Sequence, residues 1–253
     1  MMEKLPLVLI VNDDGIYSKG IKMLVDTLRS SAEIIVVAPD KPQSGMSHAI
    51  TINGIIRLNE IAIFPGVLSY TCSGTPVDCV KLAISEILNQ KPDLILSGIN
   101  HGENTSTNVL YSGTMGAAIE ASMCLIPSIG FSLADFSFDA DFSHCGPSIL
   151  ELVKLRLNHK IPKNVSLNVN FPPISQGVIR GIKFCKQADL HWDDAFVKRI
   201  DQYGLPYFWM SGTFDKSEAT EGTDIWAVNN GFVSVVPTQF DLTDYALLNQ
   251  LTT

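Results

Sequence analysis

The stretch LVLIVNDDG, at residues 7–15, decides the fold. A short continuous apolar run bounded by turn residues is typical of a strand that is buried on both faces, as in a parallel sheet. The run leads directly into Asp13 and Asp14, which we therefore place at the carboxyl end of that strand. Open α/β sheets bind their ligands beyond this end. Two adjacent carboxylates repel each other unless a cation lies beside them, so the pair is a candidate metal site. The alternative is that one aspartate only caps the next helix.

Outward from this stretch, strand and helix patterns alternate up to about residue 170, which predicts an α/β domain with a mostly parallel sheet and flanking helices. The predicted strands are 33–38, 49–58, 67–72, 93–97, 128–131 and 166–170. The predicted helices are 18–31, 76–89, 112–123 and 149–157. Residues 39–48 and 98–111 follow strands and are rich in polar and turn-forming residues, so we expect loops that carry a functional site.

Beyond Gly177 the pattern changes to short strands without helices between them, at 178–184, 203–210, 223–229 and 231–237. The sequence Asn229-Asn230-Gly231 predicts a tight turn between the last two. The segment from Trp192 to Met210 contains more aromatic residues than a solvated hairpin needs, and it predicts an arm that packs on a partner subunit. The alternative is that this hairpin folds back onto its own domain.

Composition limits the classes of function. The 253 residues are 46 % apolar and 17 % charged, which is typical of a globular protein with a substantial core. A net charge of -8 argues against general binding to a nucleic-acid duplex or an anionic membrane. The five widely spaced cysteines form no zinc-binding pattern and predict buried thiols in a reducing compartment. The apolar run at the N-terminus ends without a cleavage site for secretion, and we expect a cytoplasmic protein.

Three strand-end loops are expected to open on one crevice if their strands are neighbours. They would bring together the carboxylates of Asp13 and Asp14, the hydroxyl of Ser44 and the carboxamide oxygen of Asn100. These are oxygen ligands of the kind preferred by Mg²⁺, Mn²⁺ or Ca²⁺, and no cluster of cysteine or histidine in the sequence favours zinc.

A helix that opens with Ser112-Gly113-Thr114 offers backbone N–H groups, hydroxyl donors and the positive end of the helix dipole. Such a helix start suits a phosphate, and beside a metal it indicates phosphoryl chemistry. Taken singly, Ser112 or Thr114 is more often just a helix cap, and Asn100 more often a turn residue. It is their shared location that favours a site.

Four motifs resemble those of the SurE family: VNDDG at 11–15, APDKPQSGMSHAIT at 38–51, SGTPVDCVKLA at 73–83 and SGINHGENTSTNVLYSGTMGAAIEA at 97–121. The resemblance implies a Rossmann-like catalytic core over residues 1–185. It also implies that residues 186–253 form a β-hairpin and C-terminal extension exchanged between the subunits of a homodimer or homotetramer. The implied activity is the metal-dependent hydrolysis of nucleoside 5'-monophosphates, and of 3'-monophosphates as an extension, to nucleoside and phosphate.

The resemblance also assigns residues to roles. It implies one divalent cation per subunit, Mg²⁺ or Mn²⁺, held by Asp13, Asp14, Ser44 and Asn100. It places Asn12, Asn104, Ser112, Gly113 and Thr114 around the substrate phosphate. Family members usually have glycine and aspartate where this chain has Ser106 and Asn108, and the His101 position varies among them.

Asp13 and Asp14 are the expected catalytic residues. The metal would bind the substrate phosphate and lower the pKa of a bound water, and either aspartate could accept the proton of that water. Direct attack by an aspartate is the alternative mechanism, although enzymes of that kind typically place their acids as D-x-D. A second alternative, kept open by Ser106 and Asn108, is a non-catalytic nucleotide- or metal-binding regulatory protein on the same fold.

Overall fold

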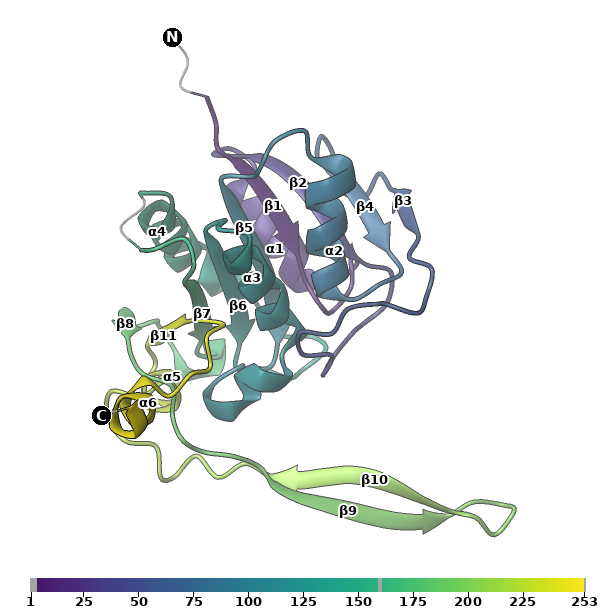
Figure 1. Cartoon of the computed structure of the whole chain (residues 1–253), viewed down its shortest axis with the longest axis vertical. Coiled ribbons are helices and arrows are strands. Elements are labelled where there is room, and N and C mark those ends of the chain that lie inside the picture. Colours follow the sequence, from purple (N-terminus) through teal and green to yellow (C-terminus); the bar gives the residue numbers. More distant parts are fainter. Residues whose placement is uncertain (1–3, 159–160, 253) are drawn as a thin grey trace.

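A computed structural model describes residues 4–158 and 161–252 of the chain. A sheet of nine strands forms its centre, in the order β3-β4-β2-β1-β5-β6-β7-β11-β8 (Figure 1). The strands of this sheet are β1 Leu7–Val11, β2 Glu33–Pro39, β3 Leu58–Glu60, β4 Leu68–Cys72, β5 Leu94–His101, β6 Ser128–Leu133, β7 Ser166–Phe171, β8 Ile182–Phe184 and β11 Val233–Thr238.

Six neighbouring strands, β4-β2-β1-β5-β6-β7, are all parallel. Their order follows the doubly wound pattern of a Rossmann-like fold, in which the chain reverses direction across the sheet between β1 and β5. The outer strand β3 is antiparallel to β4, and β11 is antiparallel to β7. The predicted Rossmann-like, mostly parallel sheet is therefore confirmed. The reversal point is where such a sheet binds its ligand, and Asp13 and Asp14 directly follow β1 there.

Helices cover both faces of the sheet. On one face, α1 Lys19–Leu28 contacts α4 Gly146–Leu157, and their apolar residues share one core cluster. On the other face, α2 Pro76–Leu82 contacts α3 Gly113–Met123. The helical spacing of the buried side chains in α1 explains its amphipathic pattern. The small residues of α3 let that helix lie close to the sheet.

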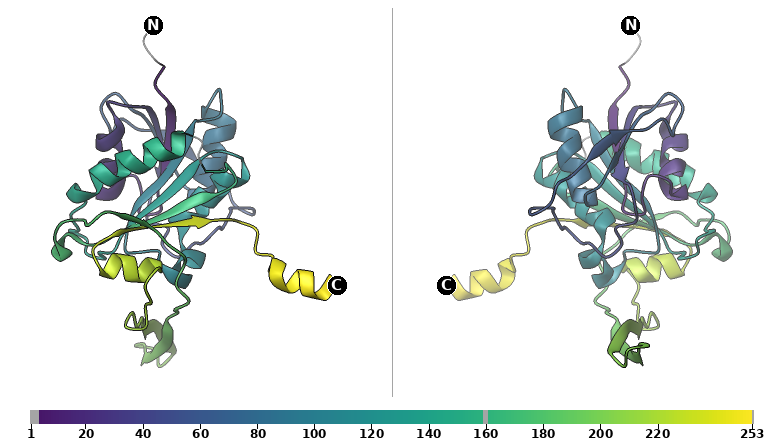
Figure 2. Two further views of the ribbon diagram at one scale, coloured as in Figure 1. Left: turned by 90° about the vertical axis from the view of Figure 1, so that its left-hand side faces the viewer. Right: turned by 90° about the vertical axis from the view of Figure 1, so that its right-hand side faces the viewer.

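The strands β9 Asp193–Ile200 and β10 Pro206–Thr213 form a separate antiparallel hairpin. Figures 1 and 2 show this hairpin projecting away from the sheet and its helices, and Figure 2 shows that the C-terminal helix α6, Tyr245–Thr252, projects as well. Within this chain the hairpin does not fold back onto its own domain. Between the two projections, α5 Asp224–Asn229 and β11 return to the sheet, where α5 packs on β11.

Three local predictions are wrong. Residues 49–57 form no strand, because Thr51 turns toward α2 and donates its N–H and hydroxyl to the Asp78 carboxylate. Residues 224–229 are the helix α5, capped by the Thr223 hydroxyl, so Asn229 to Gly231 ends a helix rather than turning a hairpin. The loop predicted at 98–111 is partly ordered structure, since β5 continues to His101 and Ser106–Tyr111 form a 3₁₀ helix.

Among the described residues, no helix is both long and apolar enough to cross a membrane.

Candidate metal and substrate site

Asp13 lies directly beyond β1 and is buried, with an exposed fraction of 3 %. The Thr114 hydroxyl donates to its Oδ1 at 2.5 Å. Gly113 is so close that an added Cβ would lie 3.1 Å from the Cβ of Asp13. Burial, and then the negative charge of Asp14, raise the pKa of the Asp13 carboxyl to about 7, although the hydrogen bond from Thr114 lowers it. The N-terminus of α3 therefore lies against a buried carboxylate, and the ionised form of this carboxylate would be stabilised by a nearby positive charge.

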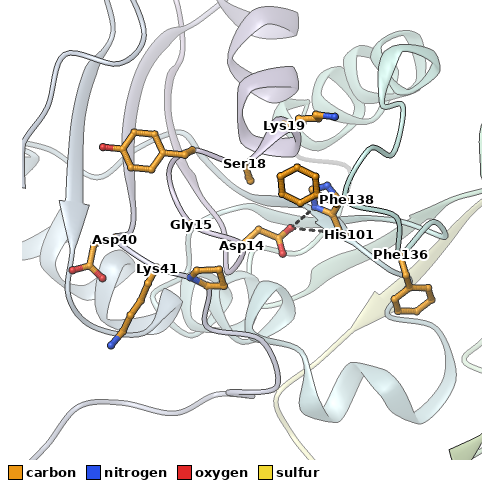
Figure 3. Close-up of a pocket in the computed structure, with 11 residues that line it drawn as sticks. Asp14, Gly15, Ser18, Lys19, Asp40, Lys41, His101, Phe136 and Phe138 are labelled. Atoms are coloured by element: carbon orange, nitrogen blue, oxygen red, sulfur yellow. Dashed lines mark hydrogen bonds and ion pairs between the residues drawn. The ribbon is translucent and has the colours of Figure 1, made fainter.

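Asp14 contacts the last residue of β5, His101. Its Oδ2 accepts from the backbone N–H of His101 at 3.0 Å and from the Nδ1 of the same residue at 3.0 Å. Figure 3 shows this double contact at the edge of a cavity of about 540 Å³ that Asp14 helps to line. From the sequence, the simple interpretation was favoured over a role of His101 in substrate contact, because a lone histidine carries little signal, and its contact with Asp14 was not predicted.

The loop from Pro39 to His48 is held against the same place. The Gln43 N–H donates to the backbone carbonyl of Asp13 at 2.7 Å, and the Ser47 N–H donates to the carbonyl of Tyr111 at 3.0 Å. A Cβ at Gly116 would lie 2.3 Å from the Ser47 carbonyl oxygen, so only glycine allows α3 to approach this loop. Ser44 is exposed and lies in the chain between these two anchors, Gln43 and Ser47. Its approach to a cation at Asp13 stays a prediction.

A group of three charged or ionisable residues anchors the end of this loop. The carboxylate of Glu120, in α3, pairs with His48 Nε2 at 2.8 Å and with Lys81 Nζ at 2.6 Å. The Glu120 side chain is buried, and these two hydrogen bonds lower its pKa, that from His48 most. Because Glu120 lies on the helix that begins at Gly113, the group ties the Ser44 loop to that helix.

Asn100 lies near the end of β5, opposite Ser132 of β6 in the register of the sheet. Its Nδ2 donates to the carbonyl of Gly102 at 2.9 Å. This contact fixes the orientation of the carboxamide and leaves Oδ1 as the atom that can bind a cation. Asn100 and Asp14 are brought to the same end of the sheet because β5 pairs with β1.

The residues present fit a hard divalent cation. Asp13 and Asp14 supply two carboxylates at one strand end, and the buried Asn12 Oδ1 near them has no hydrogen-bond partner among the described residues. The described part of the chain contains no group of three or more His, Cys, Asp or Glu residues that could hold a metal. A ligand set of two aspartates, one serine and one asparagine would not form such a group.

Two of the predicted substrate residues make internal hydrogen bonds. The Asn12 Nδ2 donates to the Gly15 carbonyl at 2.8 Å and to Ser18 Oγ at 2.9 Å, which shapes the turn between β1 and α1. Asn104 donates from Nδ2 to Ser132 Oγ at 2.8 Å and from its backbone N–H to Asn170 Oδ1 at 2.7 Å. Contact of either residue with substrate stays a prediction.

Ser112 and Thr114 have different roles. The Ser112 Oγ accepts from the N–H of Met115 at 3.0 Å and so caps α3, which is the simple alternative foreseen for it. The hydroxyl of Thr114 is not a cap, because it donates to Asp13. Contact of Ser112, Gly113 or Thr114 with a phosphate stays a prediction.

Sequence reasoning missed a polar network beneath the site. Asn168 Nδ2 donates to the Asn104 carbonyl at 2.8 Å, and Asn170 Nδ2 donates to Asn168 Oδ1 at 3.1 Å. Both asparagines belong to β7 and are buried. Their signal was present in the strand SLNVNF, where polar residues alternate with apolar ones although every position is buried.

The two departures from the usual family pattern have structural consequences. Ser106 has a φ of 53°, in the left-handed region where glycine is favoured, and its N–H donates to Asp224 Oδ2 at 2.8 Å. The Asn108 Oδ1 accepts from Trp192 Nε1 at 2.8 Å. The loop that follows β5 is therefore bound to the start of α5 and to Trp192, the residue before β9.

Comparison with known proteins gives consistent matches along the chain. The family model described as "Survival protein SurE" matches residues 8–194. A protein of Cytophaga hutchinsonii named 5'-nucleotidase SurE is 52 % identical over 97 % of this chain and 95 % of its own length. A protein of Flavobacterium johnsoniae with the same name is 49 % identical over 100 % of this chain and 98 % of its own. The crystal structure of the SurE protein from Aquifex aeolicus is similar with a TM-score of 0.82 at 39 % identity, covering 98 % of each chain.

Proposed function

Because the chain belongs to the SurE family, we propose that it is a 5'-nucleotidase, a phosphomonoesterase that hydrolyses nucleoside 5'-monophosphates to nucleoside and phosphate. Hydrolysis of 3'-monophosphates is an extension of this proposal. Curated relatives that match over the whole chain carry the name 5'-nucleotidase, which gives no support to a non-catalytic regulatory protein.

The observation that carries the proposal is the placement of Asp13 and Asp14 at the reversal point of the sheet, with the N-terminus of α3 against Asp13. We propose that Asp13, Asp14, Ser44 and Asn100 hold one divalent cation per subunit, Mg²⁺ or Mn²⁺. A cation bound there would supply Lewis acid chemistry at the phosphoryl group.

The chain's own residues then have distinct tasks. Thr114 orients the Asp13 carboxylate, and His101 orients that of Asp14. Gly113, at the first turn of α3, lets the helix N-terminus approach Asp13, where its dipole favours the negative charge of a phosphate. Asp13 and Asp14 are the candidates for accepting the proton of the attacking water, and Asn12, Asn104 and Ser112 are proposed to surround the phosphate.

We propose that residues 1–185 supply the catalytic core and that residues 186–253 hold a homodimer or homotetramer together. Large apolar side chains on the hairpin are exposed in the single chain, which is costly unless another surface covers them. Those exposed by more than half are Phe196, Ile200, Tyr203, Leu205, Phe208, Trp209 and Met210. We also propose a cytoplasmic location, because all five cysteines are free thiols.

The test is a screen for released phosphate with the purified full-length protein. Each 5'- and 3'-mononucleotide and a short polyphosphate is assayed with Mg²⁺, Mn²⁺ or EDTA. We expect release from 5'-mononucleotides with a divalent cation and loss of release in EDTA. No release under any of these conditions would contradict the proposed activity.

A further inference from the structure

The cavity beside Asp14 is larger than a metal and a phosphate require. Its volume is about 540 Å³, within the range of sites that enclose a small organic molecule. Its walls come from the turn after β1, the loop after β2, the end of β5 and the loop after β6. None of Ser112, Gly113 and Thr114 lines this cavity. Asp13 therefore faces the proposed phosphate position, whereas Asp14 faces the cavity.

Two phenylalanines of the loop after β6 form part of this wall. Phe136 is 70 % exposed and Phe138 is 87 % exposed, although both line the cavity (Figure 3). Lys19 Nζ lies 5.8 Å from the centroid of the Phe138 ring. The two rings still expose apolar surface to water beside the site, and a ligand that covers it would gain free energy. Tyr17 contributes a third exposed ring to the same cavity.

The Phe136 ring is held in place by the backbone beneath it. A Cβ at Gly102 would lie 2.3 Å from Phe136 Cε1, so the ring rests where only glycine leaves room. The Gly102 N–H donates to the carbonyl of Asp135 at 3.0 Å, and the Ser137 N–H donates to Asp135 Oδ1 at 2.9 Å. These bonds fix the backbone on both sides of Phe136, and Gly102 supports one edge of its ring.

We propose that this cavity is the nucleoside subsite and that the base of the substrate stacks on Phe136, with Phe138 closing its outer side. This inference rests on the proposed function, since a nucleoside monophosphate whose phosphate lies at Asp13 must place its nucleoside nearby. Asp14, the residue next to Asp13 in the chain, lines this cavity. Aromatic rings stack on every nucleobase, because each base has a π-face, so this subsite would accept several bases.

The test compares two substrates that differ only in the base, AMP and ribose 5-phosphate. In Phe136→Ala, kcat/KM for AMP should fall about tenfold through a higher KM, while that for ribose 5-phosphate should change less than twofold. Phe136→Tyr should keep most of the activity toward AMP, because it keeps a ring. The matched control is Phe184→Ala, an exposed phenylalanine of β8 that does not line the cavity. This variant should leave kcat/KM unchanged for both AMP and ribose 5-phosphate.

Equal loss for both substrates, or no loss for either, would overturn the inference. So would dissociation of an oligomer in Phe136→Ala, measured by light scattering, because the ring would then pack on another copy of the chain. If the wild-type protein releases no phosphate from either substrate, the proposed function fails separately. Titration calorimetry with adenosine then decides on the subsite. Binding to the wild type that weakens about tenfold in Phe136→Ala supports it, and no binding refutes it.

Discussion

The hydroxyl of Thr114, in the first turn of α3, donates to the Oδ1 of Asp13 at the end of β1. This single contact joins the two parts of the site that the sequence predicted separately, a carboxylate pair and a phosphate-binding helix start. The Thr114 hydroxyl is therefore engaged with the Asp13 carboxylate rather than free to donate to a phosphate.

Replacement of Thr114 by valine should therefore weaken metal binding. The valine keeps the volume but cannot donate to Asp13, and a hydrogen bond to a charged group contributes about 1.5–3 kcal/mol. We expect a fall of tenfold or more in the affinity for Mn²⁺, measured by calorimetry, with Thr114→Ser close to the wild type. Unchanged Mn²⁺ affinity in Thr114→Val would show that this contact does not organise the metal ligands.

Replacement of Ser112 by alanine separates a cap from a substrate contact. Loss of the cap of α3 should cost about 1 kcal/mol of the free energy of unfolding. Thr75→Ala, which removes the cap of α2 and a hydrogen bond to the Ala49 carbonyl, serves as the control and should cost at least as much. If Ser112 also contacts the substrate phosphate, only Ser112→Ala should raise KM for AMP. Equal KM values for AMP in the two variants would show that Ser112 only caps α3.

The Glu120 group predicts a pH dependence of stability. Hydrogen bonds from His48 and Lys81 depress the pKa of Glu120 in the folded protein, so protonation weakens the folded state. The stabilisation should be complete above the pKa of an unfolded glutamate, about 4.3, and should be lost as the pH falls toward the lower pKa of the folded state.

The variant Glu120→Gln lacks this titration. At pH 6 it should be less stable than the wild type by about 1–3 kcal/mol, and the gap should narrow at pH 3.5. Denaturant unfolding at the two pH values measures it. A gap that stays the same at both values would mean that the carboxylate charge contributes nothing.

Removal of the hairpin tests its role in assembly. The intact chain should be at least a dimer by light scattering at micromolar concentration. Asp193 pairs with Thr213 across the hairpin, so a short Gly-Ser linker can replace residues 193–213 and leave Leu190 and Trp192 in contact with the loop after β5. The shortened chain should be a monomer or should aggregate. A monomeric intact protein would refute the role of the arm.

The sequence predicted the parallel core well, because strands buried on both faces give continuous apolar runs such as LVLIV. The sequence-based prediction failed where a local pattern is compatible with two kinds of secondary structure. Residues 223–229 contain β-branched and aromatic residues typical of a strand, yet Thr223 caps a helix there. Residues 49–57 have the pattern of an edge strand, yet Thr51 donates its hydroxyl to the distant Asp78 and these residues form no strand.

The site likewise contains residues that the sequence predicted and residues that it did not. The sequence predicted Asp13, Asp14, Ser44 and Asn100 because each lies at or beyond the carboxyl end of a predicted strand, and the parallel sheet brings those strand ends to one edge. Their binding of a cation stays a prediction. His101, Phe136 and the asparagines of β7 could not, since their roles depend on contacts between segments far apart in the chain. The contact between His101 and Asp14 spans 87 residues, and that between Asn104 and Asn170 spans 66.

The central claim is that Asp13 and Asp14 bind a divalent cation. The most direct test is the melting temperature of the wild type and of Asp13→Asn as Mn²⁺ is added. Without metal, the variant should be at least as stable as the wild type at pH 8, because it removes a buried charge next to Asp14.

At a Mn²⁺ concentration about 100 times the dissociation constant, binding should stabilise the wild type by about 2.7 kcal/mol, or roughly 5–10 °C for a protein of this size. Asp13→Asn should show little of this shift, because it lacks one ligand charge. A wild-type melting temperature that does not respond to Mn²⁺, or an equal response in the variant, would contradict the metal site.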